Sequence, residues 1–203
     1  MPMTRQRFRL SAILYLSCSV LATPALAQQF ESASGTKVTI YGHLNFGVQY
    51  YDDGEDSETN FADSNVSTSR VGLNYDIPNG EDRFRFQFET SLGFPRSDNF
   101  SQLDDPDFDW TKENLRKIDL SYSSARFGKV SAGQGSMATD GLAKMELSGT
   151  SVVATADPSD LAGNFEFIQD GELSGIEIDD GFTDFDGPRA GRIRYDTPEF
   201  SGF

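Results

Sequence analysis

Residues 37–50, KVTIYGHLNFGVQY, decide the fold because apolar and polar side chains alternate along them. Successive side chains of an extended strand point to opposite faces, so the alternation predicts one apolar face and one polar face. Ordinary strands have about 5–6 residues. A tilted strand that crosses a membrane needs about 9–11. The length of this stretch therefore predicts a single membrane-spanning β-strand.

The same alternation returns along the rest of the chain. It is clear in residues 67–77 and 83–94, and shorter or weaker in residues 117–122, 127–134 and 189–197. With the first stretch, this makes six predicted strands. In each of them the apolar residues share one face and the polar or charged residues share the other.

The connections between these strands alternate in length. Long segments at residues 52–66, 95–114 and 135–188 alternate with short turns at 78–82 and 123–125. In an up-and-down antiparallel sheet, all the long segments then lie at one end. Transmembrane barrels have this asymmetry, with short periplasmic turns and longer extracellular loops. A secreted β-sandwich also has alternating strands, but its strands are shorter and its polar faces carry fewer arginines.

Residues 1–27 have the pattern of a cleaved signal peptide. Arg5, Arg7 and Arg9 precede an apolar stretch, and Ala25-Leu26-Ala27 is a small-x-small cleavage site. Cleavage would remove these three arginines and take the formal net charge from −15 to −18. Such an acidic chain lacks the basic footprint that nucleic-acid binding requires.

Cleavage would also remove Cys18, the one cysteine of the chain. The remaining residues then have no thiol for a disulfide, a metal site or a nucleophile. They also contain no nucleophile elbow, phosphate-binding loop or pair of metal-ligating histidines. We therefore expect a protein that is not an enzyme.

Four motifs resemble, in chain order, landmarks of the general Gram-negative porins, and most closely their alphaproteobacterial branch. They are VTIYGHLNFGVQYYDDG (38–54), STSRVGLNYDIPNG (67–80), FGKVSAGQGS (127–136) and RIRYDTPEFSGF (192–203). The resemblance implies an outer-membrane homotrimer of closed barrels of about 16 strands, each around an aqueous channel. Six strands cannot close such a barrel, so we interpret residues 28–203 as its N-terminal part, and the chain as truncated.

Basic residues of the polar strand faces are the predicted pore wall. The resemblance places Arg70 at the constriction arginine of the second strand and Lys117 at a basic position of the fourth, while Arg192 and Arg194 fit the sixth strand by parity. Each follows shortly after the start of its strand, so we expect all four at a similar height in the pore. Further predicted lumen residues are Arg83, Arg85, Glu89 and Asp119.

Residues 135–188 occupy the place of the third external loop, which the family folds into the barrel. The segment has twelve acidic residues and one basic residue, Lys144. Glu146, Asp157 and Asp160 are the acids that we expect to oppose the basic wall. An acidic mouth concentrates cations by focusing the electric field. This charge distribution predicts a weak preference for cations.

One stretch of the same loop, IEIDDGFTDFDG, is similar to a calcium-binding loop because clustered carboxylates suit this hard cation. Its spacing differs from the EF-hand pattern, and a solvated acidic loop is the alternative interpretation. The weak calcium ligands would be Asp179, Asp180, Asp184 and Asp186. We expect no other cofactor.

The predicted function is a water-filled channel for passive diffusion of small hydrophilic solutes and ions, surrounded by outer-membrane lipid. Two alternatives stay open at this point. One is a substrate-selective channel for sugars or anions, and the other is a soluble secreted β-domain that binds carbohydrate or calcium. A sugar channel would carry a row of aromatic residues in its lumen, and Tyr41 is the one aromatic residue that parity places there.

Overall fold

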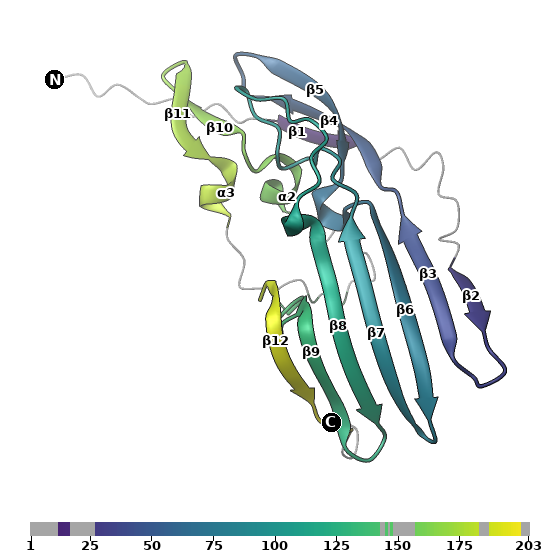
Figure 1. The fold of residues 1–203 in the computed structure, drawn as a ribbon. Helices are drawn as coiled ribbons and strands as arrows, with labels where there is room; N and C mark the ends of the chain where they lie inside the picture. Colours follow the sequence, from purple (N-terminus) through teal and green to yellow (C-terminus); the bar gives the residue numbers. More distant parts are fainter. Residues whose placement is uncertain are drawn as a thin grey trace.

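The computed structural model describes residues 12–16, 27–142, 145, 147, 157–182 and 187–199. Within them, seven strands form one antiparallel sheet in the order β12-β9-β8-β7-β6-β3-β2, which we call the wall sheet (Figure 1). Its strands are β2 (Gln28–Glu31), β3 (Lys37–His43), β6 (Arg70–Asn79), β7 (Asp82–Ser91), β8 (Leu115–Ser124), β9 (Gly128–Ser136) and β12 (Arg189–Asp196). This confirms the all-β, antiparallel, up-and-down fold class. The described sheet is open, with β2 and β12 at its edges.

Short turns gather at one end of the wall sheet, as the connection lengths predict (Figure 1). Gly80 and Glu81 join β6 to β7, and Gly80 has a φ of 64°, in the left-handed region that glycine adopts without strain. Beside this turn lies the one that joins β2 to β3, because a Cβ on Gly35 would lie 3.3 Å from Cγ of Pro78. We call this end the turn end and the opposite end the loop end.

The prediction of one strand over residues 37–50 is wrong. β3 ends at His43, and β4 (Phe46–Asp52) pairs instead with β5 (Ser57–Asp63) in a second sheet. Asn45 lies at the break, where its backbone N–H donates to Oγ of Ser69 (2.9 Å) and its side-chain amide donates to the carbonyl of Ser67 (2.9 Å). These bonds replace the strand ladder, so the chain leaves the wall sheet here.

The second sheet also contains β1 (Ala12–Leu16), which pairs with β4 and gives the order β1-β4-β5. β1 lies inside the segment predicted as a signal peptide. Cleavage after Ala27 would remove this strand and expose the edge of β4. Cleavage itself stays a prediction.

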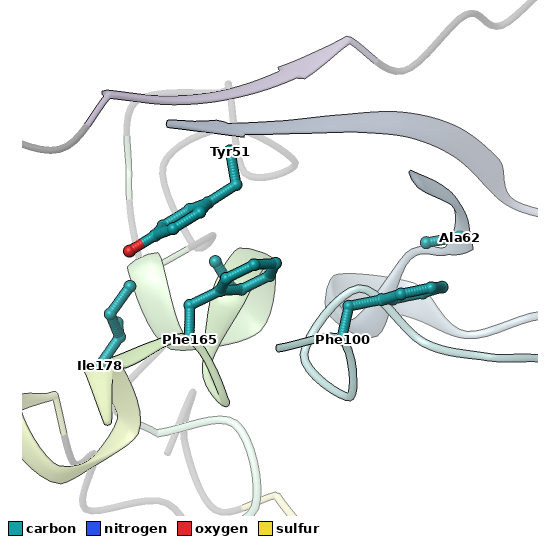
Figure 2. Packing of buried hydrophobic residues seen from close by; sticks show 6 residues of the cluster. Tyr51, Ala62, Phe100, Phe165 and Ile178 are labelled. Atoms are coloured by element: carbon teal, nitrogen blue, oxygen red, sulfur yellow. The ribbon is translucent and has the colours of Figure 1, made fainter. Parts of the chain in front are cut away.

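The buried apolar core lies at the loop end rather than against the wall sheet. The long segment after β9 contributes α2 (Pro158–Ala162), β10 (Glu166–Gln169), β11 (Glu172–Glu177) and α3 (Ile178–Gly181) to this end. Figure 2 shows Tyr51 of β4 over Phe165 and Ile178, and Phe100 beside Ala62 of β5. Residues 46–63, 92–114 and 157–182 thus form one packed body, which we call the loop-end unit.

The wall sheet buries little apolar surface, because its apolar face is exposed. One cross-strand row of this face contains Tyr75, Leu120 and Ile193, which are 40%, 62% and 85% exposed. β6, β7 and β8 have ten residues each. That is the length of a tilted membrane strand, about 9–11 residues. Among the described residues, no helix has the length and apolar character to span a membrane.

Candidate functional site

The polar face of the wall sheet collects its charged side chains in cross-strand rows. The backbone register sets Tyr41 beside Gly72, Gly72 beside Glu89, and Glu89 beside Lys117. Because side chains alternate between the faces, all members of such a row point to the same side. Predicted lumen residues of four strands therefore meet on one surface.

Glu89 of β7 lies at the centre of the densest group, the Glu89 cluster, which also contains Tyr41, Arg70, Arg116 and Lys117. Oε1 of Glu89 lies 2.6 Å from Nε of Arg116 and 3.7 Å from Nη1 of Arg70. Oε2 lies 3.8 Å from Nζ of Lys117 and accepts a 2.8 Å hydrogen bond from the Tyr41 hydroxyl. The cluster joins the predicted residues Arg70, Lys117 and Glu89.

Arg116 is a member that parity on the sequence misses. Its neighbour Lys117 pairs with Glu89, so an unbroken ladder would turn Arg116 to the apolar face. A register shift between Glu89 and Thr90 sets Thr90 opposite Leu115, which leaves Arg116 as an extra residue of β8. Such a bulge re-aims a side chain. In the sequence, the one sign of this bulge is that two basic residues, Arg116 and Lys117, follow each other.

Arg192 and Asp119 form a second group on the polar face. Nη1 and Nη2 of Arg192 lie 2.8 and 3.1 Å from the two carboxylate oxygens of Asp119. Arg192 also donates to the carbonyls of Gly133 and Ser136. A Cβ on Gly135 would lie 2.9 Å from Nη2, so glycine leaves room for the guanidinium. The predicted residues Arg192 and Asp119 thus meet as a neutral bidentate pair.

The other predicted arginines make separate contacts on the same face. Arg85 makes a bidentate pair with Asp76 (2.7 and 2.9 Å), and Arg83 lies 3.5 Å from the same carboxylate. Arg194 binds Asp196 at 2.7 Å and donates to the carbonyls of Ser136 and Met137. The wall thus carries ion pairs along most of its length.

The expectation that Arg70, Lys117, Arg192 and Arg194 share one height stays a prediction. The register sets Arg70 beside His43, Lys117 in the Glu89 row, Arg192 in the Asp119 row and Arg194 opposite Ser131, so they occupy four successive rows of the polar face. Strands of a barrel tilt by about 35–45° to its axis, so different rows do not by themselves mean different heights in a pore.

A cavity of about 860 Å³ lies at the loop end, between the wall sheet and the loops. Arg70, Arg116 and Arg189 line it from the wall strands. Acidic residues line it from the loops, among them Asp109, Asp140 and Asp160. In its lining, Nε of Arg189 lies 4.0 Å from the Asp140 carboxylate. The arrangement sets cations of the wall against anions of the loops.

The predicted loop acids have different places. Asp157 caps α2, where its carboxylate accepts the backbone N–H of Asp160 (3.0 Å). Asp160 is mostly buried, and its Oδ1 accepts from Nδ2 of Asn65 (3.3 Å) at the cavity wall. Glu146 lies outside the described residues. Of the two acids that the structure describes, Asp160 lines the cavity and Asp157 does not.

The calcium prediction falls partly outside the described residues, because Asp184 and Asp186 are not among them. Asp179 and Asp180 lie in α3 with exposed side chains, and Asp180 accepts the backbone N–H of Glu177 (3.1 Å). In the part of the chain that the structure describes, no three acidic, histidine or cysteine side chains lie close enough to hold a metal ion.

Two acidic loop residues have raised pKa values: Asp63 is buried where the loops meet the wall sheet, and Asp98 is half-buried within the loop-end unit. Asp63, at the end of β5, accepts hydrogen bonds from the backbone N–H and hydroxyl of Ser69 at 2.7–2.9 Å. Burial raises the pKa of the Asp63 carboxyl above its usual range, although the Ser69 bonds oppose this. Burial likewise raises the pKa of Asp98, against the lowering effect of Arg96.

Comparison with known proteins agrees with this geometry. A family model described as Gram-negative porin matches residues 12–203. No curated protein and no solved structure matches the chain. The match covers both the wall sheet and the loop-end unit, and the family is one of outer-membrane channels rather than of enzymes. A sheet with an exposed apolar face and a charged opposite face, and a family match over nearly all of the chain, show that this chain belongs to the Gram-negative porins.

Proposed function

We propose that this porin is a water-filled channel for passive diffusion of small hydrophilic solutes and ions. The observation that carries the proposal is the contrast between the two faces of the wall sheet. Lipid would contact the exposed apolar rows that contain Tyr75, Leu120 and Ile193. Water would contact the opposite face, where Glu89, Asp119 and their arginine partners lie. Porins of about 16–18 strands leave an aqueous channel along such a face.

We further propose a weak preference for cations. The loop end contributes most of the acidic residues, and an acidic mouth raises the local concentration of cations. The arginines of the wall oppose this effect, because charged lumen side chains also tune selectivity. A permeating ion therefore passes a negative potential near the loop acids and a positive potential near the wall arginines. The two effects partly cancel, so we expect the net preference for cations to be small.

A homotrimer, as in the porins that the sequence resembles, is part of the same proposal. One stretch of the apolar face would then pack against neighbouring protomers rather than lipid. A trimer that resists detergent and dissociates on heating would support this assembly. A protein that migrates as a monomer before heating would contradict it.

The test is conductance of the purified full-length protein in planar bilayers. Stepwise openings with a current proportional to salt concentration are expected, with a reversal potential in a salt gradient that indicates a weak cation preference. Liposome swelling with sugars of increasing size gives the second measurement, and a smooth decline of the rate with size is expected. Saturable uptake of one sugar would indicate a substrate-selective channel instead, and clear anion selectivity would contradict the proposed preference.

A further inference from the structure

Three cationic side chains share one carboxylate in the Glu89 cluster. Arg70, Arg116 and Lys117 all have a charged nitrogen within 4 Å of Glu89, so three positive charges and one negative charge leave a net of +2. In the next row of the same face, Arg192 and Asp119 balance one positive charge against one negative charge. The Glu89 cluster is therefore a local excess of positive charge beside a neutral pair.

Burial makes this excess a fixed feature of the wall. The side chain of Glu89 is 5% exposed, and those of Arg116 and Arg70 are 14% and 17% exposed. Tyr41 holds the second carboxylate oxygen through its hydroxyl, and its ring lies over Gly72, where a Cβ would collide with it. Glu89 thus has a set position from which it attracts cations of two neighbouring strands.

The cluster also borders the space through which solutes would pass. Arg70 and Arg116 line the cavity of about 860 Å³ at the loop end, whereas Arg192 and Asp119 do not. Arg70 is held there by bonds to the carbonyl of Thr68 (3.0 Å) and the hydroxyl of Ser67 (2.6 Å). Guanidinium groups with this placement attract anions that enter the cavity.

We propose that Glu89 is the residue that sets the ionic selectivity of this channel, because it fixes the position and net charge of Arg70 and Arg116, which line the cavity, and of Lys117 beside them. The proposal rests on the proposed channel function. It assigns the contact for small inorganic or carboxylate anions to this cluster of the wall. It also assigns a pore role to Arg116, which reaches the polar face through the bulge in β8.

The test is the cation-to-anion permeability ratio, measured from reversal potentials in a KCl gradient with the full-length protein in planar bilayers. Glu89→Gln raises the net charge of the cluster from +2 to +3 with little change of shape, and the ratio should fall about threefold, as for one charge several ångströms from a permeating ion. Arg116→Gln lowers the net charge to +1, and the ratio should rise.

Asp119→Asn is the matched control, because it removes one negative charge from the same polar face at a carboxylate whose arginine partner, Arg192, does not line the cavity. Its effect on the ratio should be clearly smaller than that of Glu89→Gln. The double variant Glu89→Gln with Arg116→Gln restores the net charge to +2 and should return the ratio toward that of the wild type.

An equal shift for Glu89→Gln and Asp119→Asn would overturn the proposal, as would Arg116→Gln if it moved the ratio in the same direction as Glu89→Gln. Heat-modifiable migration on gels shows that each variant is folded. If Glu89→Gln fails that check, the direction of the Arg116→Gln shift decides alone. Absence of any conductance from the wild type would instead refute the channel function itself.

Discussion

Asp63 shows how a single residue connects the wall sheet to the loop-end unit. Its carboxylate binds Ser69, which precedes β6, while its backbone N–H donates to the carbonyl of Pro95 (2.8 Å) and its carbonyl accepts from Ser97 (2.9 Å). A buried carboxylate that accepts several hydrogen bonds orders the chain around it, although desolvation disfavours its charge. Asp63 therefore links stability to pH.

Asp63→Asn provides the prediction at this scale. The raised pKa means that the folded state binds the proton more tightly than the unfolded state. As pH falls through the raised pKa toward the unfolded value of 3.8, the wild type should gain stability relative to Asp63→Asn, and the gain is lost as pH rises again. Denaturant unfolding in detergent at a series of pH values, followed by Trp110 fluorescence, measures this difference.

Trp110 is the one tryptophan of the chain and donates to Oγ1 of Thr90 (2.9 Å) at the top of β7, so it reports on the loop that Asp63 holds. The other acidic residues are the same in the wild type and in Asp63→Asn, so their effects on stability cancel in the difference between the two proteins. A stability difference that stayed constant with pH, or that grew on going to neutral pH, would show that the Asp63 carboxyl is not raised in pKa.

At the scale of elements, β8 combines regular alternation with one local exception. From Lys117 to Tyr122 its side chains alternate between the charged face and the apolar face, as the sequence predicts. Arg116 interrupts this order at the bulge. A bulge adds one residue to one strand only, so its position depends on the partner strand β7 and not on the sequence of β8 alone.

Leu120→Arg tests which face of β8 meets lipid. Leu120 lies mid-strand on the apolar face and is 62% exposed, so an arginine there should destabilise the inserted protein by about 2–4 kcal/mol. Gln87→Arg is the matched control, because Gln87 lies on the charged face opposite Asp119. Urea unfolding in lipid vesicles should detect a large loss for the first variant and a small effect for the second. Equal losses of stability in the two variants would mean that neither face of β8 contacts water.

At the scale of the whole molecule, the wall sheet and the loop-end unit differ in where their apolar side chains lie. The wall sheet exposes its apolar side chains, whereas the loop-end unit encloses Tyr51, Ala162, Phe165 and Ile178 in a small core. The rings of Tyr51 and Phe165 stack with centroids 3.9 Å apart, although the two residues come from different loops. The core therefore ties the loops into one body that does not depend on lipid.

Phe165→Ala should loosen the loop-end unit without preventing insertion of the wall sheet. Phe165 is fully buried, and truncation of a buried phenylalanine costs about 3–5 kcal/mol. Limited proteolysis of the inserted protein should show faster cleavage within residues 157–182, while heat-modifiable migration is kept. Phe167→Ala, at a neighbouring residue that is 40% exposed, is the control. Equal cleavage of the two variants would show that this core does not hold the loops.

Much of the wall sheet could be predicted from the sequence because its information is local. In β6 and β7, side chains alternate between the two faces because each strand is pleated. Lipid on one side of the sheet requires apolar residues along the whole of that face. The length asymmetry of the connections likewise predicted one loop end and one turn end. The charged face with Arg70, Glu89, Asp119 and Arg192 follows from the same parity.

The remaining features required the tertiary structure, because they depend on residues far apart in the chain. Asn45 ends β3 through bonds to Ser67 and Ser69, and the core of the loop-end unit joins three separate segments. The row in which each arginine lies depends on the stagger between strands, which alternation within one strand does not encode. Thus the sequence by itself determined which side chains share a face, and only the register and the bulge of β8 decided that Arg70, Arg116 and Lys117 meet at Glu89.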